Sequence, residues 1–297
     1  MKQGLFRFMC SAVILSFTVA ACGGKNDSRD KTDDRPVLVV SILPQSYFAS
    51  RIAENRVRIM TLVGPGQSPH DYEPSPKQMA ALAAAKVWVL SNTEFEIALR
   101  PKVEALFPDL SIVDGTQGVR FRSLEDGDDH GDTIDRHIWL GHKPARIMAA
   151  HIQDALINMD ADGESLYQKN YRELTDDMDQ EFGALREKLS PLRGKVVFVY
   201  HPAFGYFLDE FGIIQEAVET GGKEPTPRAL KLLIERAKKE KAVAIFVQAQ
   251  FPVSTAKTTA DAAGAILATL DPLAPDWLAN IRTMGEVLQK NAEETVK

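Results

Sequence analysis

Short apolar runs alternate along the chain with segments of helical period. Runs of this length, rich in β-branched residues, are typical of strands buried on both faces of a parallel sheet. The first half of the chain has four of them, at residues 37–42, 57–63, 87–90 and 110–114. The second half has four more, at residues 195–200, 213–218, 243–247 and 265–270. The segments between them predict helices at residues 46–53, 75–86, 95–107, 204–211, 226–240 and 254–263, with a last helix from about residue 275.

Prolines mark the beginnings of two of these helices. Ser75 and Thr226 stand at N-cap positions, and each is followed by a proline at the first helical position. A proline there costs no hydrogen bond because the first amide of a helix has no partner inside it. Pro101, by contrast, falls inside the segment 95–107 and predicts a kink or a break.

A long helical segment separates the two alternating halves. Residues 115–143 break the rhythm and contain the acidic stretch "EDGDDHGD" at 125–132, which we expect to be a solvated loop. A helix then starts near Pro144, and "DADG" at 160–163 separates it from the next one. From Tyr167 to Leu189 the apolar positions recur every three or four residues. Residues 164–190 as one helix would span about 40 Å, enough to bridge two lobes.

These patterns predict an α/β protein with two lobes. Each lobe would be a mostly parallel four-stranded sheet flanked by helices, and one long rigid helix would link the two lobes. We place the N-terminal lobe at residues 36–143, the linking helical segment at 144–190 and the C-terminal lobe at 191–297.

The first 35 residues do not fit either lobe. Residues 1–22 have a positively charged start, a short apolar core and small residues before Cys22, which is typical of a secretory signal. The ending "VAAC" is similar to a bacterial lipobox, in which the cysteine receives lipid and becomes the new N-terminus. Residues 23–35 are polar and charged and predict a flexible tether. We therefore expect an extracytoplasmic lipoprotein held to a membrane through Cys22.

Composition narrows the chemistry further. The chain has 297 residues, a formal net charge of −6 and no long run of Lys or Arg, which argues against nucleic-acid binding. Its two cysteines are Cys10, in the signal, and Cys22. The mature protein would then have no disulfide and no thiolate, so a metal site would have to use imidazole and carboxylate ligands.

Four candidate ligands fall next to predicted strand ends or at the boundary between lobes. His70 lies in the proline-rich loop "GPGQSPHDYEP" after the second strand, and His201 directly follows the strand "VVFVY". Asp271 follows the last strand, and His137 precedes the long helix. A single histidine at a strand end is more often a surface residue than a ligand. Together, in a cleft between lobes, three imidazoles and a carboxylate suit zinc.

Several stretches resemble the substrate-binding lipoproteins of zinc and manganese ABC importers. They are "GPGQSPHDYEPSPKQMAAL", "RHIWLGHKPAR", "YHPAFGYFLDEFGI", "GKEPTPRALKLLIERAKKEKAVAIFVQAQF" and "LDPL". The resemblance runs in order from about residue 36 to the C-terminus. It implies a two-lobed trap that hands its ion to a membrane permease, and we expect a monomer.

Carried over from that family, the metal ligands fall on His70, His137, His201 and Asp271. Family members that favour manganese commonly have glutamate at the third position, so His201 favours Zn2+ over Mn2+ as the cargo. A manganese- or iron-binding member of the same family is the alternative.

The chain departs from the family pattern at three places. Arg136 and His142 stand where the family usually has proline, and we expect His142 to be a surface residue or a partner of a ligand. Gln248 stands where the family often has glutamate. The loop that is long and histidine-rich in many zinc members is short here and holds only His130.

Two other functions remain open. A zinc-dependent hydrolase would need an open coordination position and a general base, and the chain has no HExxH motif and no Ser or Cys nucleophile motif. A surface lipoprotein whose metal only stabilises the fold would need that metal to fold at all. We therefore expect no enzymatic activity.

Overall fold

The computed structural model describes residues 33–124, 134–217, 227–239, 244–248, 257, 260–262 and 266–295. The predicted signal peptide, nearly all of the tether, the acidic loop with His130 and most of the predicted helix at 254–263 lie outside these residues. Within the described part of the chain, no helix combines the length and the apolar character that crossing a bilayer requires.

The N-terminal lobe is built on a parallel sheet of four strands. These are β1 (Val37–Val40), β2 (Arg58–Thr61), β3 (Val87–Leu90) and β4 (Ser111–Asp114), in the order β2-β1-β3-β4. The two central strands, β1 and β3, are buried at every position, as their continuous apolar sequences predict. Helices α1 (Leu43–Ala53), α2 (Pro76–Ala84) and α3 (Glu94–Leu106) connect the strands.

The C-terminal lobe repeats this plan with the strands β7 (Val196–Val199), β8 (Ile214–Ala217), β9 (Ala244–Gln248) and β10 (Ile266–Leu270). Their order is β10-β9-β7-β8, and all pairs are parallel. Read from the opposite edge, as β8-β7-β9-β10, it is the strand order of the N-terminal lobe. Helices α6 (Gly205–Asp209) and α7 (Pro227–Lys239) belong to this lobe. The prediction of two four-stranded parallel sheets with flanking helices is confirmed. In both lobes a strand ends towards a loop that carries a candidate ligand.

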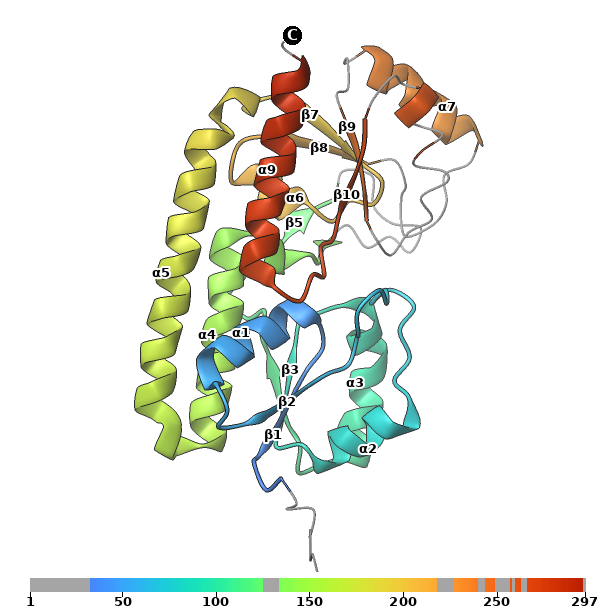
Figure 1. Ribbon diagram of the computed structural model, residues 1–297. Helices are drawn as coiled ribbons and strands as arrows, with labels where there is room; N and C mark the ends of the chain where they lie inside the picture. The colour runs from blue at the N-terminus through green and yellow to red at the C-terminus, as the bar shows by residue number, and fades with distance from the viewer. Residues whose placement is uncertain are drawn as a thin grey trace, which may run out of the picture. The chain divides into compact units, whose positions relative to one another are not determined.

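The long linking helix is α5 (Glu164–Lys188), with 25 residues and a length of about 38 Å. It packs against α1, α4 (His142–Met159) and the C-terminal α9 (Trp277–Thr295), so it contacts helices from both ends of the chain (Figure 1). Its predicted apolar face is buried, including Tyr167, Leu174, Met178, Phe182 and Leu185. The short helix η2 (Ala161–Gly163) separates α4 from α5, where "DADG" predicts an interruption.

Three local features add to the prediction or differ from it. Of the kink or break predicted at Pro101, the break does not occur, because helix α3 continues through this residue. Helix α4 begins at His142, near Pro144 as predicted, and Pro144 lies in its first turn, where a missing amide hydrogen costs nothing. Residues 115–143 contain an antiparallel pair, β5 (Arg122–Ser123) with β6 (Ile134–Asp135), followed by η1 (Ile138–Leu140). Strands of two residues are too short to leave a periodic pattern in the sequence.

Candidate metal centre

His70 lies in the loop between β2 and α2, and its side chain is 24% exposed. The loop contains Pro65, Pro69 and Pro74, which restrict its backbone. The hydroxyl of Tyr72 donates a hydrogen bond to the carbonyl of Leu62 (2.6 Å), which fastens the loop to the end of β2. The loop therefore presents His70 in a largely ordered backbone. On the other side of the ring, Nδ1 lies 3.3 Å from Glu94 Oε2.

His137 lies between β6 and η1 and is held by a carboxylate two residues before it. Asp135 Oδ1 accepts hydrogen bonds from the backbone N–H of His137 and from its ring Nδ1, both at 3.0 Å. The side chain of Asp135 is completely buried and also pairs with Arg122 at 2.9 Å. A carboxylate on Nδ1 leaves Nε2 as the free ring nitrogen, which is the usual arrangement at metal-binding histidines.

His201 follows β7 and is 5% exposed. The side-chain amide of Gln248, at the end of β9, holds its backbone on both sides. The N–H of His201 donates to Gln248 Oε1 (3.3 Å), and Gln248 Nε2 donates to the carbonyl of His201 (2.6 Å). Glutamate has no N–H with which to donate to that carbonyl, so glutamine fits this position where the family often has glutamate.

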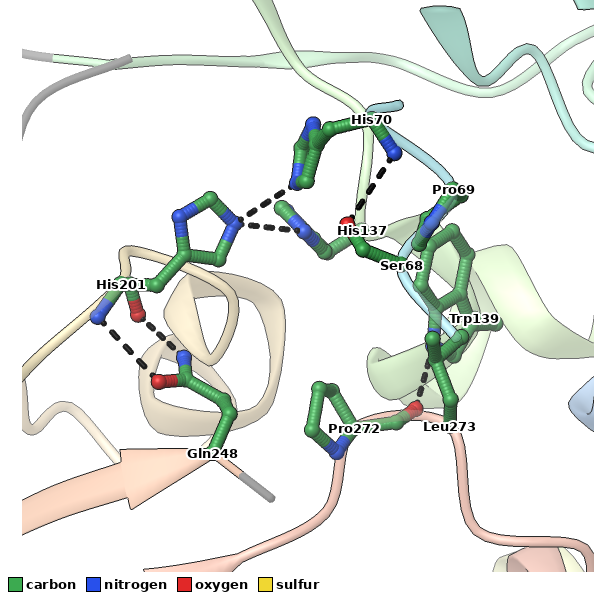
Figure 2. A pocket seen from close by; sticks show the side chains of 9 residues that line it. All are labelled: Ser68, Pro69, His70, His137, Trp139, His201, Gln248, Pro272 and Leu273. Atoms are coloured by element: carbon green, nitrogen blue, oxygen red, sulfur yellow. Dashed lines mark hydrogen bonds between the residues drawn. The ribbon is translucent and has the colours of Figure 1, made fainter. Parts of the chain in front are cut away.

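The three histidines bring their Nε2 atoms together. His201 Nε2 lies 3.1 Å from His70 Nε2 and 3.2 Å from His137 Nε2, and the candidate donor atoms of all three residues lie within 4.8 Å of one another (Figure 2). In a tetrahedral zinc site with Zn–N bonds of about 2.0–2.1 Å, neighbouring ligand nitrogens are about 3.3 Å apart. The two distances from His201 Nε2 are therefore close to what a zinc ion requires. Ser68, Pro69, Trp139, Gln248, Pro272 and Leu273 complete the pocket around them.

Burial favours the neutral imidazole of His201. Burial, and after it the charges of His137 and His70, lower the pKa of His201 well below its ordinary value. Neutral imidazole is the form that binds a metal ion. Burial alone would raise the pKa of Glu94, but the hydrogen bond and the charge of His70 outweigh it and lower that pKa to about 2. Glu94 therefore stays a carboxylate next to the site.

Asp271 is not part of the three-histidine group, which among the described residues contains no carboxylate. It follows β10, and its Oδ1 accepts a hydrogen bond from the backbone N–H of Leu273 (2.9 Å). Pro272 and Leu273, the two residues after it, do line the pocket. The structure thus brings together three of the four candidate ligands and places the fourth beside the pocket wall.

The other described histidines have different partners. His142 Nε2 lies 2.7 Å from Asp179 Oδ1, and its ring stacks on Phe182 with 4.7 Å between ring centroids. His151 Nε2 lies 2.8 Å from the carbonyl oxygen of Gln117. His142 is therefore outside the three-histidine cluster.

The family model described as "ZnuA: Zinc-uptake complex component A periplasmic" matches residues 38–293. The chain belongs to this family. The description is that of an uptake component and not of an enzyme, in agreement with the expectation from the sequence.

Curated relatives of this chain include proteins named for zinc and proteins named for manganese. The zinc-binding lipoprotein AdcA of Streptococcus pneumoniae is 26% identical over 280 residues, which are 88% of this chain and 54% of AdcA. The high-affinity zinc uptake protein ZnuA of Yersinia pestis is 28% identical, covering 80% of this chain and 82% of that protein. The manganese ABC transporter lipoprotein PsaA of S. pneumoniae is 26% identical, with 84% and 82% covered. The chain thus spans about half the length of AdcA and most of the length of the other two.

Solved structures of the ZnuA type have the same fold. A crystal structure of ZnuA has a TM-score of 0.80 and 31% identity, and covers 86% of this chain and 99% of that one. The periplasmic zinc-binding protein TroA of Treponema pallidum has a TM-score of 0.78, with 86% and 99% covered, and its 18% identity supports the fold alone.

Sequence patterns do not reveal the side chains that hold the three histidines. Glu94 stands just ahead of the predicted helix at 95–107, and Arg122 belongs to a stretch without a periodic pattern. Asp135 stands out in the sequence only as the residue before Arg136, which replaces a usual proline. The spacing Asp-x-His at 135–137 is the one signal that suggests a carboxylate on a ligand ring.

Proposed function

We propose that the protein captures a divalent metal ion, zinc first of all, outside the cytoplasm and passes it to an ABC importer. The convergence of the three Nε2 atoms carries this proposal, because the rings come from three distant parts of the chain. Three imidazoles that face one another at this spacing match the nitrogen donors of a zinc site. The relatives named as zinc-uptake and zinc-binding proteins support the same function.

The proposed ligands are His70, His137, His201 and Asp271. The first three stand on the spacing of their ring nitrogens. Asp271 is proposed because it follows β10 and the two residues after it line the pocket. Water is the alternative fourth ligand.

Zinc is preferred to manganese on the chemistry of the donors. Imidazole nitrogen suits zinc, whereas manganese favours additional carboxylate oxygen. The relatives include both zinc- and manganese-binding proteins, so their names alone do not decide the metal. His201, in place of a third-position carboxylate, is the residue on which the preference rests.

The remaining parts of the proposal concern location and partners. We propose removal of a signal peptide at residues 1–22, a lipid on Cys22 and a flexible tether over residues 23–35. The lobes then extend over residues 36–143 and 191–297, with the linking segment at 144–190. The cargo would pass to the permease of a metal importer from a monomeric binding protein. The names of the lipoprotein relatives support this arrangement.

The decisive experiment is competitive titration of zinc against manganese on metal-stripped protein, together with elemental analysis of protein purified without added metal. We expect one zinc ion for each chain and a clear preference for zinc. Manganese binding with equal or higher affinity would overturn the assignment of the metal. In the same titration, Asp271→Asn should weaken zinc binding and the exposed control Asp109→Asn should not, whereas wild-type affinity in Asp271→Asn would leave the fourth position to water.

A thermal melt separates a transport site from a purely structural one. The described core is formed by apolar side chains on both sheets and on α5, none of which needs a metal ion. Metal-stripped protein should therefore be folded, and zinc at about 100 times its Kd should add about 2.7 kcal/mol of stability by mass action. Stripped protein that is unfolded would support the structural alternative instead.

A further inference from the structure

The buried carboxylate of Asp135 joins a candidate ligand to an arginine. Its Oδ1 receives the ring and backbone N–H groups of His137, and its Oδ2 receives Arg122 Nη1 at 2.9 Å. No part of the Asp135 side chain is exposed, while that of Arg122 is 26% exposed. A buried carboxylate that lost its cationic partner would be strongly destabilised, so the guanidinium keeps Asp135 in place.

Arg122 also reaches α6, the helix that begins four residues after His201. Its Nε donates to Asp209 Oδ2 at 2.5 Å, and its backbone N–H donates to the hydroxyl of Tyr206 at 2.9 Å. That hydroxyl in turn donates to the backbone carbonyl of Asp135 at 2.8 Å. The guanidinium thus connects β5 and β6 with α6.

Gly205, the first residue of α6, leaves the space in which the guanidinium lies. A Cβ atom at this position would overlap Arg122 Nη1 and would come within 2.9 Å of Asp135 Oδ2. The close approach of α6 to this ion pair therefore depends on a residue without a side chain.

We propose that Arg122 is a positioning residue, which fixes the ring of His137 through Asp135 and joins that ring to α6, so that His137 and His201 form a preformed pair of ligands. The inference rests on the proposed metal-binding function. It adds a residue outside the ligand set that contributes to the affinity of the site.

The orientation of the His137 ring follows from the direction of its hydrogen bond to Asp135. A carboxylate paired with a guanidinium accepts hydrogen bonds, so His137 must carry its hydrogen on Nδ1 and direct the lone pair of Nε2 towards the ion. Without Arg122, Asp135 could turn and the ring could adopt the other tautomer. Binding of the ion would then have to order the His137 ring as well, and the free energy that this costs would lower the affinity.

The first test needs neither a variant nor a metal ion. Nitrogen-15 NMR of the histidine rings in metal-stripped wild-type protein should show His137 as the Nδ1–H tautomer with a distinct Nε2 signal. An Nε2–H ring, or averaged signals from a ring that exchanges between tautomers, would overturn the proposal. Because this spectrum is recorded without zinc, a failure here is distinct from a failure of the proposed function.

The second test compares zinc affinities by competitive titration. Loss of a partner that orients a metal ligand typically costs about 10–100-fold in affinity, and we expect this loss for Arg122→Gln, with partial recovery in Arg122→Lys. Arg51→Gln is the matched control because Arg51 forms a 2.7 Å ion pair with Asp177 of α5 and is 34% exposed. Wild-type affinity and an unchanged His137 ring in Arg122→Gln would overturn the proposal even if zinc binding itself is confirmed.

Two further variants cover the possibility that Arg122→Gln does not fold. Removing both charges together, in Asp135→Asn with Arg122→Gln, avoids a buried unpaired carboxylate and should still weaken zinc binding about 10-fold. Gly205→Ala, a change in α6, should displace the Arg122 guanidinium and thereby alter the ring signals of His137. Its control is Gly183→Ala, since a Cβ at Gly183 would meet no atom within 4 Å. Unchanged His137 signals in Gly205→Ala, or wild-type affinity in the double variant, would contradict the proposed role.

Discussion

The Nε2 atoms of His70 and His201 lie 3.1 Å apart, but the two rings are held in different ways. His201 directly follows a buried strand, is 5% exposed and has its backbone fixed on both sides by Gln248. His70 lies on a loop, its side chain is 24% exposed, and its ring partner Glu94 is 41% exposed. The C-terminal lobe therefore holds His201 tightly, while the loop between β2 and α2 leaves His70 partly exposed.

This difference suggests a division of roles within one site. The buried ligand can define the position of the ion, because strand ends are rigid and Gln248 has no exposed surface. The loop ligand can adjust as an ion enters or leaves, although three prolines keep the entropy of ordering it low. A strand end thus gives a rigid candidate ligand and a loop gives an adaptable one.

The largest expected effect comes from removing each ligand in turn. His201→Ala should weaken zinc binding by more than about 100-fold, because a direct ligand is lost rather than an outer partner. His70→Ala should cost at least about 10-fold less than His201→Ala, since water can reach this position and take its place. Calorimetric or competitive zinc titration of both variants measures the ratio. Equal losses, or a greater loss in His70→Ala, would remove the proposed difference between the lobes.

Gln248→Glu tests how the rigid ligand is anchored. The new carboxylate oxygen would face the carbonyl of His201 at the present N–O distance of 2.6 Å, so two acceptors would meet without a hydrogen. We expect a loss of about 1–3 kcal/mol in the free energy of unfolding, together with weaker zinc binding. Chemical denaturation of metal-stripped protein measures the first. A stable Gln248→Glu protein would show that this double hydrogen bond is not required.

The pH dependence of metal-stripped protein tests the burial of His201. Its pKa in the folded protein is lower than the 6.5 of the unfolded chain, so below pH 6.5 the unfolded state binds a proton that the folded state does not. Stability should therefore fall as pH falls below 6.5, by at most about 1.4 kcal/mol for each pH unit from this group. Melting curves at about pH 7.5 and about pH 5.5, on either side of that value, should show a smaller change in His201→Gln than in the wild type. An identical change in both proteins would contradict this reasoning.

Glu94→Gln tests the weaker hold on the adaptable ligand. Glu94 is partly exposed and contacts only His70 Nδ1 within the cluster, so its loss should weaken zinc binding by less than about 10-fold, at the lower end for an outer partner. The exposed pair Arg100–Glu104 on the same helix provides the control Glu104→Gln. A loss as large as that in His201→Ala would mean that Glu94 itself reaches the ion.

The smallest effect is expected at His142. Its ring stacks on Phe182, its Nε2 lies 2.7 Å from Asp179 Oδ1, and it is not one of the three clustered histidines. His142→Ala should leave zinc affinity within about twofold of the wild type and lower stability by about 1 kcal/mol through lost packing. Titration and a melt of the same sample separate the two. Greatly reduced zinc affinity with an unchanged melt would place His142 in the binding machinery.

The amino-acid sequence by itself determined the elements and the neighbourhood of the site. Apolar runs predicted the strands, proline positions predicted the start of α2, and the period from Tyr167 onward predicted the buried face of α5. These signals are local, because each depends on residues within one or two turns or strands. Histidines that follow predicted strands could be selected for the same reason.

Only the tertiary structure decided which side chains hold the ligands and how closely the ligands meet. Gln248 and His201 are 47 residues apart, and Arg122 meets Asp209 across 87 residues. The indole N–H of Trp139 bonds to the carbonyl of Pro272 from 133 residues away, which brings the segment after β10 to the pocket. No periodicity encodes such pairs, because they depend on how whole lobes pack and on atomic distances of a few ångströms.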